Sequence, residues 1–117
     1  MIPPRVCEIA RFTEDIPAMA RFYQQLLGVE PQYQAEGIAI FVSGGVKILI
    51  HANYTPGEDD LPPEDHVAFA VPDVDRTCAR LVENGLHLVS EPRDWPWGRS
   101  AHLRDPDGHL IELSQGQ

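Results

Sequence analysis

Short segments along this chain alternate apolar and polar residues with a period of two, the spacing typical of β-strands whose two faces differ. Residues 43–45 (Ser-Gly-Gly) and residues 105–108 (Asp-Pro-Asp-Gly) each separate two such segments, as expected for the turns of β-hairpins. The pattern predicts strands at 5–12, 37–42, 46–51, 66–71 and 109–113, and further extended segments at 86–91 and 99–103.

Two other segments carry apolar residues at intervals of three and four, which is the spacing of an amphipathic helix. One begins after Asp15 and ends at Gly28, and the other begins after Asp73 and ends at Gly85. An aspartate suits the N-cap because its carboxylate accepts a hydrogen bond from the first helical turn, and glycine suits the residue that closes a helix. The sequence therefore predicts one helix after the first strand and one after the strand at 66–71.

The second half of the chain repeats the plan of the first. Glu8 precedes its helix cap by seven residues, as His66 does, and Leu49 and Glu112 each follow a hairpin glycine by four residues. Glu8, Leu49, His66 and Glu112 are therefore equivalent positions, two in each half. The second half has about five more residues between its helix and its hairpin, and these are expected in a loop at 94–98.

Each half is thus predicted to be a βαβββ module, at about 5–53 and about 64–116, and the two together to form one α+β domain over residues 1–117. A helix covers only one face of the strands of its module, so the other face is buried elsewhere or lines a cavity. Alternation along the strands places the polar residues Glu8, His66 and Glu112 on the face opposite the helices.

The charge balance is strongly acidic, with 18 acidic and nine basic residues and a formal charge of −9 over 117 residues. Nucleic acids and anionic membranes attract clustered Lys and Arg, so neither is the expected partner. Cys7 and Cys78 lie in apolar patterns and are expected to be buried thiols in a reducing cytoplasm. No apolar run approaches the ~20 residues that span a bilayer, and no signal peptide is evident at the start.

Three segments carry a resemblance to a known family: DPDGHLIEL at 105–113, EDIPAMARFYQQLLG at 14–28 and DHVAFAVPDVD at 65–75. With the repeated module, the chain resembles the glyoxalase, bleomycin-resistance protein and dioxygenase superfamily, also called the vicinal oxygen chelate family. The resemblance implies a curved sheet around a cleft with the helices on its outer face, and a homodimer. It also implies that metal ligands stand at the four equivalent positions.

Leu49 departs from that family pattern because its side chain cannot bind a metal. Three ligands would remain, namely Glu8, His66 and Glu112, a set that suits Mn²⁺, Fe²⁺, Ni²⁺ or Zn²⁺ with positions open for water or substrate. Such an ion polarises a carbonyl and stabilises a developing oxyanion. In the alternative, metal-free reading, His66 is a hydrogen-bonded residue of the cleft wall and Glu112 pairs with Arg99.

Other residues are candidates for the same cleft. His51 lies on the face of Leu49 and is the candidate catalytic base, and Lys47 on that face could hold an anionic group. Phe12 is the candidate apolar floor. Trp97 and Arg99 are expected as a cleft wall and a cation for an anionic substrate, although the indole could instead simply anchor its loop.

Three further histidines, His87, His102 and His109, lie beside turns and are expected at the surface. Two classes of function therefore remain open. The first is a metal-dependent lyase, isomerase, thiol transferase or dioxygenase acting on a small oxygen-bearing substrate. The second is a metal-free protein that sequesters an apolar or cationic drug-like molecule, for which the negative charge is favourable.

Overall fold

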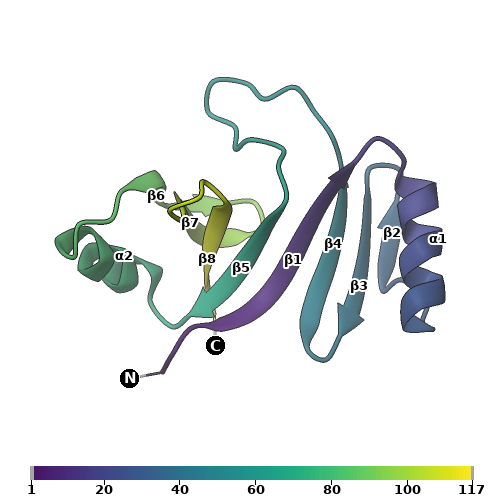
Figure 1. Ribbon diagram of the computed structural model, residues 1–117, viewed down its shortest axis with the longest axis horizontal. Helices are drawn as coiled ribbons and strands as arrows, with labels where there is room; N and C mark the ends of the chain where they lie inside the picture. Colours follow the sequence, from purple (N-terminus) through teal and green to yellow (C-terminus); the bar gives the residue numbers. More distant parts are fainter. Residues whose placement is uncertain (1, 117) are drawn as a thin grey trace. The chain divides into compact units, whose positions relative to one another are not determined.

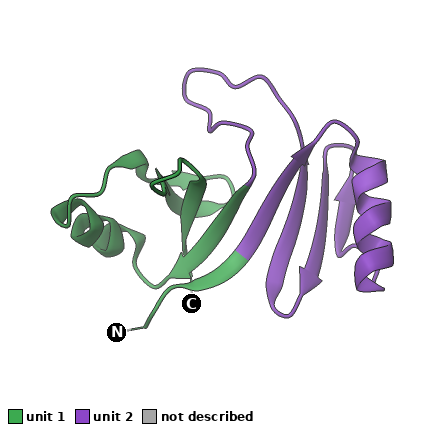
Figure 2. Ribbon diagram, in the orientation of Figure 1, with its two compact units in different colours: residues 1–7, 66–117 green, residues 8–65 purple. Residues whose placement is uncertain are grey.

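The computed structural model describes residues 2–116 and contains eight strands and two helices, which confirms the predicted α+β class. Figure 2 shows two compact units. One unit comprises residues 8–65, and the other comprises the residues up to Cys7 together with those from His66 onward. Strand β1 (Arg5–Thr13) begins in the second of these units and continues into the first.

The unit of residues 8–65 holds the strands in the order β2-β3-β4-β1 (Figure 1). Strands β3 and β4 form the predicted antiparallel hairpin, β2 adds to β3 antiparallel, and β4 pairs with β1 in parallel. The elements after β1 are α1 (Ile16–Leu27), β2 (Tyr33–Ala35), β3 (Ile38–Ser43) and β4 (Val46–Ala52).

The other unit repeats this arrangement with the strand order β5-β8-β7-β6. Strand β8 pairs in parallel with β5 and antiparallel with β7, and β6 lies beside β7 at the edge. Its elements are β5 (His66–Val71), α2 (Val74–Glu83), β6 (Leu88–Trp95), β7 (Gly98–Arg104) and β8 (Leu110–Gln115).

The strand registers agree with the internal repeat that the spacing predicts. Strand β1 places Ala10 beside Leu49, and β5 places Ala68 beside Glu112. Ala10 follows Glu8 by two residues, and Ala68 follows His66 by two residues. The positions that are equivalent in sequence therefore occupy equivalent places in the two units.

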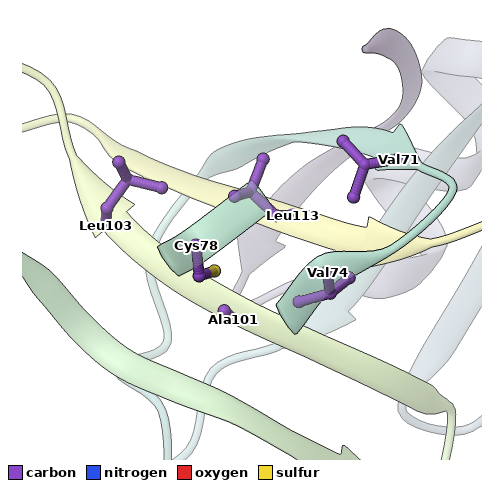
Figure 3. Packing of buried hydrophobic residues seen from close by; sticks show 6 residues of the cluster. All are labelled: Val71, Val74, Cys78, Ala101, Leu103 and Leu113. Carbon is purple, nitrogen blue, oxygen red and sulfur yellow. The ribbon is translucent and has the colours of Figure 1, made fainter. Parts of the chain in front are cut away.

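Each helix packs on one face of the strands in its own unit. Helix α1 contributes Ile16 and Ala20 to a core with Phe41 and Ile50, and α2 contributes Val74 and Cys78 to the second core. Figure 3 shows the second core, in which the side chains of Val71, Ala101, Leu103 and Leu113 meet the helix. Because side chains alternate along a strand, the neighbours of these residues on β5, β7 and β8 lie on the face away from α2.

Both predicted N-caps are confirmed. The Asp15 carboxylate accepts a hydrogen bond from the backbone N–H of Ala18 at 3.0 Å, and the Asp73 carboxylate accepts one from Arg76 at 3.1 Å. Gly28 ends α1 in the left-handed conformation, with φ of 70°. Helix α2 ends one residue earlier than expected, because Asn84 is the cap and Gly85 follows it with φ of 92°.

The prediction of a loop at 94–98 is wrong. Strand β6 continues through Trp95, which pairs with Gly98 at the start of β7, so that only Pro96 and Trp97 form the turn. The additional residues of the second half lie instead within β6, whose pairing with β7 shifts register twice. Pro96 is compatible with this hairpin because a turn residue needs no ladder N–H.

Short strand β2 was also not predicted from the sequence, because its three residues are all exposed and carry no alternating pattern. Within residues 2–116, no helix is long and apolar enough to cross a membrane.

The Asp73 cap provides a test of the helix assignment. Replacing Asp73 with alanine removes the acceptor for the Arg76 N–H and is expected to lower the free energy of unfolding by about 1 kcal/mol. Glu83→Ala, at the exposed far end of the same helix, is the matched control and should change it by less than about 0.5 kcal/mol. Urea unfolding followed by circular dichroism measures both, and equal effects would contradict the capping role.

Candidate functional site

A carboxylate with three polar neighbours lies on the face of β8 away from helix α2. Glu112 accepts a hydrogen bond on Oε1 from His102 Nε2 at 3.1 Å and one on Oε2 from the Ser114 hydroxyl at 2.7 Å. His66 Nε2 lies 3.6 Å from the same Oε1 atom, close enough for an electrostatic contact but too far for a good hydrogen bond. We call Glu112, His66, His102 and Ser114 the Glu112 cluster.

The strand order explains why these side chains meet. Strand β8 lies between β5 and β7, so residues of both neighbours can reach a side chain at its centre. His102 is the direct partner of Glu112 in the β7–β8 register, and His66 is two residues before Ala68, the partner in the β5–β8 register. The period of two puts all of them on one face.

The cluster is almost closed to solvent. The His102 side chain is fully buried, and the side chains of Glu112 and His66 are only 7% and 10% exposed. Burial alone raises the pKa of the Glu112 carboxyl, but the hydrogen bond from His102, the contact with His66 and the hydrogen bond from Ser114 outweigh burial. These neighbours hold the pKa of Glu112 well below its ordinary value, so the carboxylate is charged at neutral pH.

The prediction of a surface position for His102 is wrong. The signal was present in the sequence, because His102 alternates with Ala101 and Leu103 on β7 and therefore stands on the opposite face from the helix core. Its Nδ1 atom has no hydrogen-bond partner among the described residues, and the same holds for the buried hydroxyl of Ser100 on the same face.

An aromatic stack adjoins the Glu112 cluster at the β6–β7 turn. The indoles of Trp95 and Trp97 are stacked with centroids 5.1 Å apart and planes 12° from parallel, and the Arg93 guanidinium carbon lies 3.7 Å from the Trp95 ring centre. Trp95 meets the imidazole of His102 edge-on at 6.2 Å. Trp97 itself is 61% exposed. The predicted wall residue Trp97 thus connects to Glu112 through Trp95 and His102.

Arg99 forms its hydrogen bonds with Asp75 and Asp94 and not with Glu112. Its guanidinium donates to both oxygens of Asp75 on α2, at 2.7 and 2.8 Å, and to Asp94 at 3.1 Å. The hydrogen bonds from Arg99 hold the pKa of the Asp75 carboxyl below its ordinary value. Glu112 therefore pairs with His102 and not with Arg99, and a role for Arg99 in holding an anionic substrate stays a prediction.

The remaining candidates lie in the unit of residues 8–65. Phe12 and His51 are partners in the β1–β4 register, and their rings are 5.3 Å apart. His51 Nδ1 lies 2.8 Å from the carbonyl oxygen of Ala52. Lys47 is exposed on β4 beside the partly buried Glu8 on β1. The structure thus joins Phe12 to His51 in one aromatic cluster and Lys47 to Glu8 in one register pair.

The predicted metal ligands divide between the two units, because Glu8 belongs to residues 8–65 whereas His66 and Glu112 belong to the other unit. Within the described part of the chain, no group of three or more His, Cys, Asp or Glu side chains is arranged to hold a metal ion. Both oxygens of Glu112 already accept hydrogen bonds, Oε1 from His102 and Oε2 from Ser114. Neither unit by itself therefore presents a complete metal centre.

Comparison with known proteins shows the family. Residues 5–113 match the model of the Glyoxalase/Bleomycin resistance protein/Dioxygenase superfamily, and the chain belongs to this superfamily. Its members bind small-molecule substrates, commonly use divalent metals and often act as dimers.

Two relatives and one solved structure illustrate the similarity. Anthracycline biosynthesis protein DnrV of Streptomyces peucetius is 33% identical over 126 residues, which cover 98% of this chain but only 44% of DnrV. YraH of Bacillus subtilis (strain 168) is 30% identical, and the alignment covers 93% of this chain and 96% of YraH. A superfamily member from Vibrio splendidus 12B01 has the same fold, with a TM-score of 0.66, 21% identity and coverage of 97% and 100%.

The low pKa of Glu112 predicts how stability depends on pH. Ionised Glu112 stabilises the fold above about pH 4.3, the ordinary glutamate value, and this contribution is lost as the pH falls below it. Between pH 7 and pH 3, chelator-treated wild-type protein should therefore lose about 1–3 kcal/mol more stability than Glu112→Gln, whose amide does not titrate.

Urea unfolding at pH 7, 5 and 3 measures this difference. Glu91→Gln, which removes an exposed carboxylate on β6, is the control and should follow the wild-type profile. Parallel profiles for Glu112→Gln and wild type would show that the carboxylate is not held in its charged form by the fold.

Proposed function

We propose that this chain binds a small oxygen-bearing organic molecule and moves a proton on it, in a reaction of the isomerase or lyase type, at the Glu112 cluster. The observation that carries this proposal is the buried, charged carboxylate of Glu112, with two imidazole Nε2 atoms directed at one of its oxygens. A buried titratable group with a strongly shifted pKa and specific charged or polar partners is a recognised mark of a functional site.

The repeat supports a functional origin for this cluster. In the other unit, the positions equivalent to Glu112 and His102 are Leu49 and Ile40, which are partners in the β3–β4 register. The same fold therefore forms with two aliphatic side chains at these places. A polar pair that the architecture does not need, and that costs desolvation, favours a chemical role over a structural one.

The roles within the cluster follow from its geometry. His102 is fully buried and hydrogen-bonded, so it fixes the Glu112 carboxylate in place. His66 is the more exposed imidazole and the one that a substrate would meet. Its imidazole would accept the proton from a carbon next to a substrate carbonyl, and the Glu112 carboxylate would stabilise the imidazolium that results.

A divalent ion remains part of the proposal as a cofactor, because members of the superfamily commonly use one. In a metal-bound form His66 would be a ligand and not the base: Glu8, His66 and Glu112 would hold Mn²⁺, Fe²⁺, Ni²⁺ or Zn²⁺, which would supply Lewis-acid polarisation of a substrate carbonyl. His51 as a further base, with Phe12 and Lys47 as substrate contacts, is proposed on the same footing. So are a homodimer and a cytoplasmic location.

A second candidate is a binding protein that performs no chemistry. The exposed indole of Trp97 and the charge of −9 favour retention of an apolar or cationic molecule. The name of DnrV, an anthracycline biosynthesis protein, also supports a small organic ligand. The chain spans less than half of DnrV, so the activity of that whole protein is not transferred to it.

Solvent deuterium exchange separates the two candidates. The protein, chelator-treated or reconstituted with each of the four metals, is incubated in D₂O with a panel of α-hydroxyketones, 1,3-dicarbonyl compounds and thioesters. Proton NMR is expected to show deuterium entering the carbon next to the carbonyl of at least one compound. His66→Gln and Glu112→Gln should lower this rate by about 100-fold or more, the usual contribution of a positioned base.

His109→Gln is the matched control, because His109 is an exposed imidazole at the turn before β8 whose Nδ1 atom contacts the neighbouring carboxylate of Asp105. It should leave the rate unchanged. Exchange that persists in His66→Gln would overturn the role of this imidazole. Binding of a panel compound with no exchange under any metal condition would favour the binding protein.

Ile40 and Leu49, the aliphatic pair at the equivalent places of the other unit, suggest a variant that separates folding from function. The double substitution His102→Ile with Glu112→Leu reproduces Ile40 and Leu49 and should keep the free energy of unfolding within about 1.5 kcal/mol of wild type. His102→Ala alone leaves the buried carboxylate short of a donor and should cost about 1–3 kcal/mol. A double variant that fails to fold would show that the cluster is structural.

A further inference from the structure

The indole of Trp97 is large and apolar and stacks on Trp95 on one side, yet it faces solvent. It is 61% exposed although it occupies a two-residue turn between paired strands. Pro96 fixes one backbone angle of this turn, and the pairing of Trp95 with Gly98 closes it. An exposed aromatic ring with few accessible conformations loses little entropy when a ligand covers it.

The face of Trp95 away from Trp97 is covered by Arg93. The Arg93 guanidinium lies over the centre of the Trp95 ring, which leaves no room for a second plane on that face, so Trp97 stacks on the other face. The edge of Trp95 meets His102. Trp97, which is 61% exposed, thus forms one end of a column of Arg93, Trp95 and Trp97, and its free face is the face away from Trp95.

From these contacts we infer that the free face of Trp97 is a stacking subsite for a planar aromatic ring, carried by the molecule that the Glu112 cluster acts on. The identity of that molecule rests on the proposed function, whereas the stacking of a ring on Trp97 does not. Trp97 reaches the cluster through two ring contacts, 5.1 Å to Trp95 and 6.2 Å from Trp95 to His102. A bicyclic or tricyclic ring has the size to cover this indole.

The charge around the subsite selects among planar rings. The face of an indole carries a negative quadrupole, so it attracts cationic or electron-poor rings, such as those that bear a carbonyl. Asp94 next to the turn is paired with Arg99, so its charge is largely compensated, but the whole chain carries a charge of −9, which disfavours an anionic ligand. The ligand class is therefore a neutral or cationic planar aromatic compound.

Three probes test this class by fluorescence titration: acridone, which is planar, neutral and bears a carbonyl; proflavine, which is planar and cationic; and anthraquinone-2-sulfonate, which is planar and anionic. Wild type is expected to bind the first two more tightly than the third. Trp97→Leu should raise the Kd of acridone about tenfold, within the range of aromatic stacking on a protein side chain. Trp97→Phe, which keeps a smaller ring, should raise it by about threefold or less.

Tyr33→Leu removes an aromatic side chain of similar exposure in the other unit and should leave the Kd of acridone unchanged. Thermal unfolding of each variant separates loss of the subsite from loss of the fold. A Trp97→Leu variant that is less stable but binds acridone as tightly as wild type would assign Trp97 to hairpin stability and overturn the inference. So would equal weakening by Tyr33→Leu, or a wild type that does not bind acridone.

His66→Gln distinguishes this inference from the proposed function. It should bind acridone with the wild-type Kd while losing deuterium exchange. If exchange is absent in wild type but the Trp97 variants still weaken acridone binding, the subsite stands and the catalytic proposal fails. If exchange depends on His66 but Trp97→Leu leaves acridone binding unchanged, the reverse holds.

Discussion

Once Glu112 is buried and charged, it constrains how the strands around it can pair. Ionised Glu112 is stable in the interior only because His102, Ser114 and His66 surround it, and each comes from a defined strand position. A shift of one residue in the register of β5, β7 or β8 would turn a partner toward the helix core and leave the charge unpaired. The polar cluster therefore also specifies how these strands pair.

The two units show how one architecture accommodates two different interiors. Leu49 and Ile40 fill with aliphatic groups the places that Glu112 and His102 fill with a charged pair. The aliphatic pair is compatible with many small shifts of its neighbours, whereas the charged pair requires hydrogen-bond geometry on every side. Of these two equivalent pairs, only the pair of Glu112 and His102 is polar, and it lies in one unit.

The contacts of Arg99 illustrate why a charged residue near a site is not automatically part of it. Arg99 and Trp97 are two residues apart, yet Arg99 binds Asp75 and Asp94 while Trp97 stacks on Trp95. The charge of a guanidinium with two carboxylates at hydrogen-bond distance is already compensated, which weakens its attraction for an anionic substrate. This arrangement agrees with a ligand that is neutral or cationic.

Periodicity and end signals by themselves determined most of the fold. The Asp15 and Asp73 caps, the hairpin turns and the equivalence of Glu8, Leu49, His66 and Glu112 are local features, set by backbone chemistry and by spacing. Alternation with Ala101 and Leu103 indicates the face on which His102 lies, but its pairing with Glu112 and the stack of Trp95 on Trp97 were decided only by the tertiary structure. Each depends on which strands become neighbours and in which register, and a strand ladder brings together residues whose separation in sequence carries no signal of their contact.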